Sequence, residues 1–315
     1  MILENTSIVF PGQGSQSLDM LSDYFDEYVS FKDAFEEASS IINVDLINLL
    51  KDGTSEDLAK TEITQPLMLA ADIAIWRQIP LKNLSSIKFL AGHSLGEYSA
   101  LVASEVITYK DAVFLVSNRA RLMQEAVPEG EGGIAAILGL PFVDIKNICQ
   151  SISKDPKNLV SPANLNSLSQ TVISGTKLGV ECAIVELKEA GAKRALLLPM
   201  SVPAHCQLME GVADEFLSFL DGVSFQEPVI PVVQNFNASI AKDLASLRNN
   251  LLCQIFSPVN WVDTIRFFEE QDIELIIECG PGKVLTGLNR QIYKDANNFA
   301  LEKVSSFKEL FIDHV

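Results

Sequence analysis

The chain has 315 residues and a formal net charge of −17, from 24 basic and 41 acidic side chains. Its apolar share of 48% and charged share of 21% exclude a disordered chain, because burial of so much apolar surface can offset the entropy lost on ordering. A surface this acidic also argues against binding to nucleic acid, whose phosphates it would repel.

The cysteines and the hydropathy profile argue against disulfide-bonded, zinc-binding and membrane proteins. The 5 Cys are odd in number and no two stand in a C-x-x-C spacing, which argues against a disulfide framework or a thiolate zinc site. We therefore expect a cytoplasmic protein without a metal. The sequence opens with no secretory signal pattern, and no stretch approaches the ~18 apolar residues of a membrane span, so we also expect no membrane contact.

The first part of the chain predicts alternating strands and helices. Apolar runs at 7–10 and 87–91 predict buried strands, each leading into a Gly-containing turn. Helical periodicity is expected over 17–50, over 55–79 with a break around Pro66, and over 97–106 and 111–126.

The middle of the chain has a different order of predicted strands and helices. Its predicted elements are strands at 133–140, 159–163, 170–174 and 194–198, with helices at 142–153 and 178–190. This βαββαβ order is the split-βαβ, ferredoxin-like pattern. We therefore predict a small ferredoxin-like insert at residues 128–200.

After the insert, α/β alternation resumes. The predicted elements are helices at 207–220, 243–256, 261–270 and 283–293, and strands at 229–235 and 273–278. We therefore predict a large α/β-hydrolase-like domain built from residues 1–127 and 201–315, with a mostly parallel sheet covered by helices.

The turn Gly92-His-Ser-Leu-Gly96 fits the G-x-S-x-G pattern between a predicted strand and a predicted helix. In a nucleophile elbow, this spacing lets the chain turn sharply and projects the Ser hydroxyl from the end of the strand. The alternative is a structural turn in which Ser94 caps the helix. The strand and helix on either side favour a nucleophile.

A Ser hydroxyl is a weak nucleophile and needs a base, for which the chain offers 3 His. His314 is the penultimate residue, and His93 adjoins Ser94, so its side chain should point away from the hydroxyl. His205 remains, in a loop between a predicted strand and a predicted helix, with helix capping as its alternative role. No Asp or Glu stands out as the group that orients it.

Two further residues could bind an anion. Arg119 lies at helical spacing from Leu115 and Val116, on the apolar face of its helix. A buried Arg needs an anionic partner, which could be a structural carboxylate or a substrate carboxylate. Gln13 stands in a Gly-rich turn that can present free N–H groups to an anion, although it fits neither nucleotide-binding pattern.

Five segments, in this order and spacing, resemble the malonyl-CoA:acyl carrier protein transacylases, the stand-alone acyltransferases of bacterial-type fatty acid synthesis. They are Phe10-Pro-Gly-Gln-Gly-Ser-Gln16, Gly92-His-Ser-Leu-Gly-Glu-Tyr-Ser-Ala100, Asn118-Arg-Ala-Arg-Leu-Met-Gln-Glu-Ala-Val-Pro-Glu-Gly130, Ser201-Val-Pro-Ala-His205 and Glu278-Cys-Gly-Pro-Gly-Lys-Val-Leu-Thr-Gly287. The resemblance runs from about residue 6 to about residue 293 and includes the small insert. The sequence departs from the family at Leu168-Ser169 and at Cys279, neither of which has a proposed catalytic role.

The resemblance implies the catalytic roles. Ser94 would be the acylated nucleophile and His205 its general base. Gln254 matches the family residue whose main-chain carbonyl orients that His, which would account for the missing acid. Gln13 and Leu95 match the main-chain donors of an oxyanion hole.

The resemblance also implies the substrates. Arg119 would clamp the free carboxylate of a malonyl group, and Asn166 would lie in the substrate site. The implied reaction transfers malonyl from coenzyme A to the phosphopantetheine thiol of acyl carrier protein, through a seryl ester. The implied enzyme is a monomer with no tightly bound cofactor. A Ser hydrolase or lipase-like enzyme, or an acyltransferase serving polyketide synthesis, remains an alternative.

An acidic carrier protein would be repelled by the overall charge, but that charge is uneven. Residues 1–118 carry 7 basic and 17 acidic side chains, whereas 190–205 and 279–294 contain basic side chains and no acidic ones. We predict that the carrier docks on these segments, because local complementary charge steers association. The predicted docking residues are Lys193, Arg194, Lys283 and Arg290.

Overall fold

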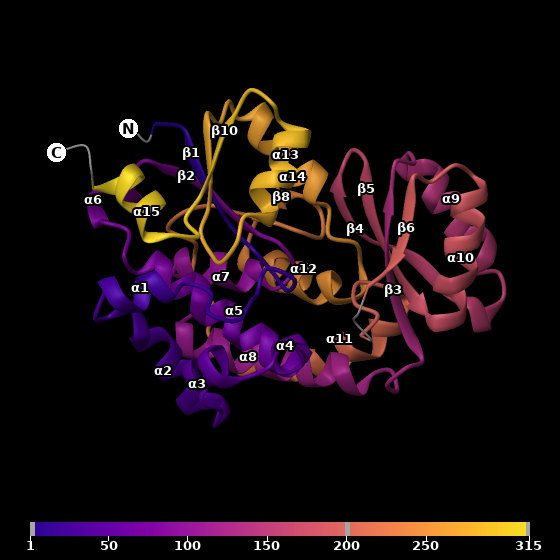
Figure 1. Ribbon diagram of the computed structural model, residues 1–315, viewed down its shortest axis with the longest axis horizontal. Helices are drawn as coiled ribbons and strands as arrows, with labels where there is room; N and C mark the ends of the chain where they lie inside the picture. Colours follow the sequence, from indigo (N-terminus) through magenta and orange to yellow (C-terminus); the bar gives the residue numbers. More distant parts are fainter. Residues whose placement is uncertain (1–3, 199–201, 313–315) are drawn as a thin grey trace.

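The computed structural model describes residues 4–198 and 202–312. Two sheets organise these residues, a larger six-stranded sheet and a smaller four-stranded one. Figure 1 shows the smaller sheet and its two helices at one end of the molecule. The segment containing Ser201, the predicted domain boundary at 200/201 and His314 lie outside the described residues.

The larger sheet has the strand order β10-β9-β1-β2-β7-β8. Its strands are β1 (Thr6–Phe10), β2 (Ile87–Gly92), β7 (Val232–Gln234), β8 (Ser239–Ile240), β9 (Leu275–Glu278) and β10 (Asn297–Ala300). All neighbouring strands pair in parallel except β7 and β8. The expectation of a mostly parallel sheet is therefore confirmed.

Helices cover both faces of this sheet, and the side chains of β1 show how. Ile8 and Phe10 belong to one buried cluster, with residues of α5 (Thr61–Trp76), α7 (Gly96–Ala103) and α8 (Tyr109–Glu125). Val9 points to the other face and packs with Trp261 and Leu285 of α13 (Trp261–Glu270) and α14 (Val284–Ile292). This period-2 alternation is that of a strand buried on both faces. It makes a three-layer α/β architecture (Figure 1).

Further helices complete the layers around the larger sheet. They are α1 (Ser22–Glu27), α2 (Phe31–Ile42), α3 (Leu46–Asp52), α4 (Ser55–Ala59), α6 (Leu81–Leu84), α11 (Glu210–Asp221), α12 (Leu244–Phe256) and α15 (Val304–Phe311), with a 3-10 turn at Gln207–Met209. The sequence did not predict α6, β8, β10 or α15.

The smaller sheet has the order β4-β5-β3-β6, and every pair in it is antiparallel. Its elements are β3 (Gly132–Leu138), α9 (Phe142–Ile152), a 3-10 turn (Pro156–Asn158), β4 (Val160–Ser167), β5 (Gln170–Thr176), α10 (Lys177–Glu189) and β6 (Arg194–Leu197). The βαββαβ order agrees with the predicted ferredoxin-like pattern. Both helices pack on one face of the sheet.

The predicted helix break at Pro66 is wrong. Pro66 lies inside the continuous helix α5, in its second turn, and the break falls at Lys60, between α4 and α5. Pro66 removes only the hydrogen bond to the carbonyl of Glu62, an exposed residue near the start of the helix.

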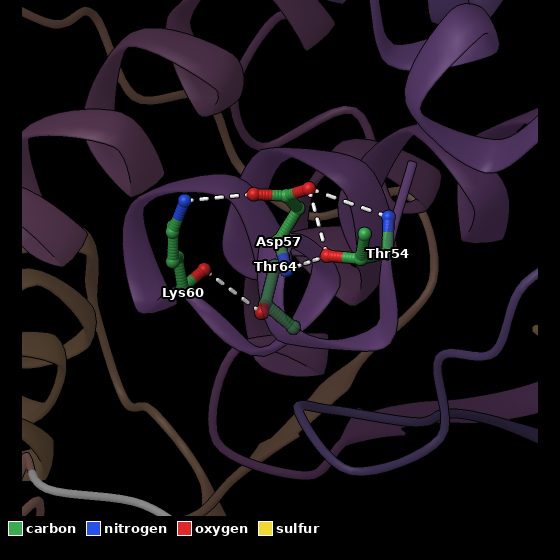
Figure 2. Close-up of polar contacts among 4 residues, drawn as sticks. All are labelled: Thr54, Asp57, Lys60 and Thr64. Carbon is green, nitrogen blue, oxygen red and sulfur yellow. Dashed lines mark hydrogen bonds and ion pairs between the residues drawn. The ribbon is translucent and has the colours of Figure 1, made fainter. Parts of the chain in front are cut away.

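Local polar contacts account for the break at Lys60 (Figure 2). Thr54 and Asp57 form a capping box that begins α4. The Lys60 ammonium lies 2.7 Å from the Asp57 carboxylate, and the Thr64 hydroxyl donates to the Lys60 carbonyl at 3.0 Å. These contacts fix Lys60 in an extended conformation between the two helices.

Candidate active site

Ser94 lies between β2 and α7 in a strained conformation, with a φ of 51°. The flanking glycines permit this turn: a Cβ on Gly92 would lie 1.9 Å from the main chain of Gly96, and a Cβ on Gly96 would lie 2.2 Å from the Phe10 carbonyl oxygen. Asn235 stabilises the turn, because its Oδ1 accepts from the Ser94 N–H at 2.7 Å and its Nδ2 donates to the Gly92 carbonyl at 2.6 Å. The local geometry is that of a nucleophile elbow.

His205 faces Ser94, with its Nε2 at 2.7 Å from the Ser94 Oγ. Its Nδ1 lies 2.7 Å from the main-chain carbonyl oxygen of Gln254. Since a carbonyl can only accept, Nδ1 carries the proton and Nε2 presents its lone pair to the Ser hydroxyl. Burial, followed by the nearby Arg119 charge, lowers the pKa of His205 to about 3. The imidazole is therefore neutral near pH 7, as a general base must be.

Arg119 reaches the same hydroxyl from α8 and is only 1% exposed. One terminal nitrogen donates to the Ser94 Oγ at 3.1 Å and to the Gln254 Oε1 at 3.0 Å, and the other donates to the Gln65 Oε1 at 2.8 Å. The guanidinium also lies over the ring of Tyr98, at 5.7 Å. Within the described residues, no carboxylate forms an ion pair with this buried cation. The direct partners of Arg119 are therefore neutral.

The carboxyl ends of β1 and β2 bring Gln13 and Leu95 to the same edge of the sheet as Ser94. Among residues 4–198 and 202–312, no hydrogen bond engages the main-chain N–H of either residue. The Gln16 side chain holds the Gln13 loop, because it accepts from the Gly14 N–H at 2.7 Å and donates to the Leu58 carbonyl at 3.3 Å. Two fixed N–H donors are therefore free to receive an anion beside the hydroxyl.

A cavity of about 380 Å³ opens between the two sheets over Ser94 and His205. Gln13 lies on its large-sheet side, and Ile134 and Val172 line it from the small sheet. Asn166 of β4 also borders this cavity, with its Oδ1 at 2.9 Å from the His93 Nε2. His93 lines the same cavity, and within the described residues its ring forms no hydrogen bond with the Ser94 hydroxyl.

The four predicted docking residues lie on exposed positions of two elements. Lys193 and Arg194 stand at the start of β6 in the small sheet. Lys283 precedes α14 and pairs with Glu302 at 3.3 Å, and Arg290 donates to the Asn298 carbonyl at 3.1 Å.

Sequence reasoning missed Gln65, Glu97 and Asn235 as members of the site. Asn235 follows the apolar strand β7 directly, and polar residues just beyond parallel strands often line the ligand crevice. That signal could have marked Asn235, but nothing local distinguishes Gln65 or Glu97 from other polar residues of helices.

Within residues 4–198 and 202–312, no group of three or more His, Cys, Asp or Glu side chains could hold a metal ion. In the same residues, no helix has the length and apolar character needed to cross a membrane. The 5 Cys are all free, with Cys149, Cys206 and Cys279 buried.

Comparison with known proteins identifies close relatives. Residues 8–304 match the acyl transferase domain family. The malonyl CoA-acyl carrier protein transacylase of Salmonella typhimurium is 44% identical over 297 residues, which are 94% of this chain and 96% of the relative. The protein of the same name from Haemophilus influenzae is 41% identical, over 97% of each chain.

Solved structures agree with this result. An acyl carrier protein S-malonyltransferase from Vibrio cholerae is 45% identical, with a TM-score of 0.91 over 98% of this chain and 100% of the other. A malonyl-transacylase in complex with a type II polyketide synthase acyl-carrier protein is 42% identical, with a TM-score of 0.92 over 97% and 98% of the two chains.

Proposed function

The chain belongs to the malonyl CoA-acyl carrier protein transacylases of the acyl transferase family, and from this premise we propose that it transfers malonyl groups from coenzyme A to acyl carrier protein. This reaction would supply malonyl units for fatty acid synthesis. One observation carries the proposal: the neutral imidazole of His205 and the buried guanidinium of Arg119 both contact the Ser94 Oγ, at 2.7 Å and 3.1 Å.

In the first half-reaction, Ser94 Oγ attacks the thioester carbonyl carbon while His205 Nε2 takes the hydroxyl proton. The carbonyl oxygen becomes an oxyanion, which the main-chain N–H groups of Gln13 and Leu95 stabilise, each contributing on the order of 10²–10³ in rate. As the tetrahedral intermediate collapses, the C–S bond breaks and His205 returns the proton to the departing coenzyme A thiol. Malonyl remains as an ester on Ser94.

The second half-reaction reverses these steps with a different thiol. The phosphopantetheine thiol of the carrier protein gives its proton to His205 and attacks the seryl ester. The C–O bond then breaks, and His205 returns the proton to Ser94. The free enzyme and the malonylated carrier protein result. Coenzyme A and the carrier are substrates in this scheme, and no tightly bound cofactor takes part.

Arg119 would select the malonyl group by binding its free carboxylate. A guanidinium can pair with a carboxylate through two parallel N–H···O bonds, which are stronger than neutral hydrogen bonds. Because the direct partners of Arg119 are neutral side chains, a substrate carboxylate would supply the missing anion. An acetyl group would leave the buried charge unpaired. Asn166 would border the same substrate site.

The carrier protein would dock on the basic residues at β6 and α14. Lys193 and Arg194 are exposed at one element, and Lys283 and Arg290 at the other, so a negatively charged carrier meets local positive charge despite the net charge of −17. We further propose that the enzyme acts in the cytoplasm as a monomer.

Two other activities are alternatives to malonyl transfer. A Ser hydrolase or lipase-like enzyme would need no thiol acceptor, and both the family and the buried Arg119 favour transfer. An acyltransferase that serves polyketide synthesis is the second candidate, since one similar structure contains a type II polyketide synthase carrier protein.

The direct test is to incubate the protein with malonyl-CoA, then with holo acyl carrier protein, and to weigh all species by intact mass spectrometry. The wild type should carry one malonyl group, which disappears as the carrier gains it. The Ser94→Ala variant should carry none. A malonyl adduct that persists on this variant would refute Ser94 as the nucleophile.

A further inference from the structure

Glu97 is a fully buried carboxylate in the first turn of α7, and the proposed mechanism gives it no role. It accepts three hydrogen bonds, from the Gln234 Nε2 at 3.0 Å, the Asn235 N–H at 2.9 Å and the Gln254 Nε2 at 2.8 Å. Burial raises the pKa of Glu97, whereas these donors lower it. Because all three neighbours donate, the ionised carboxylate is the form that matches the site.

The contact with Gln254 fixes which way the amide of that side chain faces. Its Nε2 donates to Glu97 and, at 3.1 Å, to the Ser94 carbonyl, while its Oε1 accepts from Arg119. A flipped amide would place its oxygen against a carboxylate and its NH₂ group against a guanidinium. Both contacts would then be repulsive, so only one orientation is stable.

The same carboxylate also holds Asn235, which in turn holds the strained Ser94. The main-chain N–H of Asn235 is bonded to Glu97, and its side chain bonds the Ser94 N–H and the Gly92 carbonyl. Glu97 therefore holds Asn235, which positions Ser94, and Gln254, which positions Arg119. It forms no hydrogen bond with the Ser94 hydroxyl or with the Arg119 guanidinium itself.

We infer that Glu97 is a positioning residue for acyl transfer: by accepting a hydrogen bond from the Gln254 Nε2, it directs the side-chain Oε1 of Gln254 to Arg119 and so aims the guanidinium at the substrate carboxylate. This inference rests on the proposed malonyl transfer. Removal of the Glu97 carboxylate would also leave three buried donors without an acceptor and so cost stability, which is why the test below uses a readout that a loss of folded protein does not change.

The test compares malonyl and acetyl transfer to holo carrier protein, as the ratio of the two kcat/KM values. Glu97→Leu keeps the bulk but removes every acceptor, so the Gln254 amide is released and the ratio should fall about tenfold or more. Glu97→Gln can keep a carbonyl oxygen toward Gln254, so its ratio should stay within about threefold of the wild type. A purely structural loss would lower the active fraction and so reduce both activities equally.

Two variants keep the test interpretable. If Glu97→Leu does not fold, Glu97→Asp keeps the charge but withdraws the carboxylate by about 1.5 Å, out of reach of Gln254, and should also lower the ratio. Glu278→Gln is the matched control, since Glu278 is equally buried and accepts the N–H groups of Leu285 and Thr286 at 3.0 Å and 2.7 Å, away from Ser94. Its ratio should not change.

The outcomes separate the two proposals. A wild-type protein that transfers no malonyl would defeat the proposed function. A wild type that transfers malonyl, with an unchanged ratio in folded Glu97→Leu or Glu97→Asp, would overturn only the role of Glu97. A Glu97→Gln variant as impaired as Glu97→Leu would also overturn it, because the lost charge, and not the lost acceptor, would then be responsible.

Discussion

Replacing Arg119 by Ala should change acyl selectivity more than any other single substitution in the site. The side chain is 1% exposed, so solvent would not screen a substrate carboxylate left without its partner. Loss of one partner of a buried charge pair costs about 2–5 kcal/mol. At about 1.4 kcal/mol per factor of ten, kcat/KM for malonyl-CoA should fall by about 30-fold to 4,000-fold.

Acetyl transfer should fall much less in the same variant. Arg119 also donates to the Ser94 Oγ, so part of the loss is shared by both substrates. The assay therefore measures both acyl donors with one enzyme preparation. Arg121→Ala is the control, because Arg121 lies two residues along α8 in a surface pair with Glu125 at 2.8 Å, and such pairs contribute little. Equal losses for malonyl and acetyl in Arg119→Ala would refute the carboxylate clamp.

Three further variants test the base, the docking surface and the elbow. The pKa of His205 is about 3 in the folded chain and ~6.5 when unfolded, so its contribution to stability is complete above ~6.5 and is lost as pH falls toward 3. Denaturant unfolding of His205→Gln should therefore show a shallower loss of stability on acidification than the wild type; equal slopes would contradict this. The docking variant replaces three residues by Glu: Lys193, Lys283 and Arg290. Stopped-flow measurement of the carrier half-reaction should show it slowed at low salt and less affected at high salt, and unchanged low-salt kinetics would exclude docking there. Gly92→Ala should lose about 3 kcal/mol or more of stability, because its Cβ would lie 1.9 Å from Gly96 main-chain atoms; a melting temperature near that of the wild type would contradict the elbow packing.

Local sequence patterns predicted the strands of the larger sheet well where apolar runs were continuous. β1 and β2 carry buried side chains on both faces, so their runs stand out from the surrounding polar residues. β10 was missed because Asn-Asn-Phe-Ala has no such run, and its pairing with β9 decides its conformation. Propensity alone misplaced the helix break, because Pro66 can be accommodated near a helix start.

In the candidate site, too, local sequence patterns predicted some features and not others. Ser94 could be predicted because its glycines and flanking elements are all within a few residues of it. The contacts that hold it could not, since Asn235 is 141 residues away along the chain and Gln254 is 160 residues away. Only the folded chain brings these two side chains to Ser94.

The two free donors beyond the carboxyl ends of β1 and β2, at Gln13 and Leu95, are main-chain N–H groups and do not depend on the side chains. The parallel pairing of these strands continues into the elbow through a 2.9 Å bond from the His93 N–H to the Phe10 carbonyl, so main-chain geometry sets the spacing of the N–H groups of Gln13 and Leu95. Side-chain scanning at these two positions would leave both donors in place. A substitution at Leu95, which is buried in the core, would change the packing but would keep its N–H, and only Pro, or an ester bond in place of the amide, would remove a donor at either position.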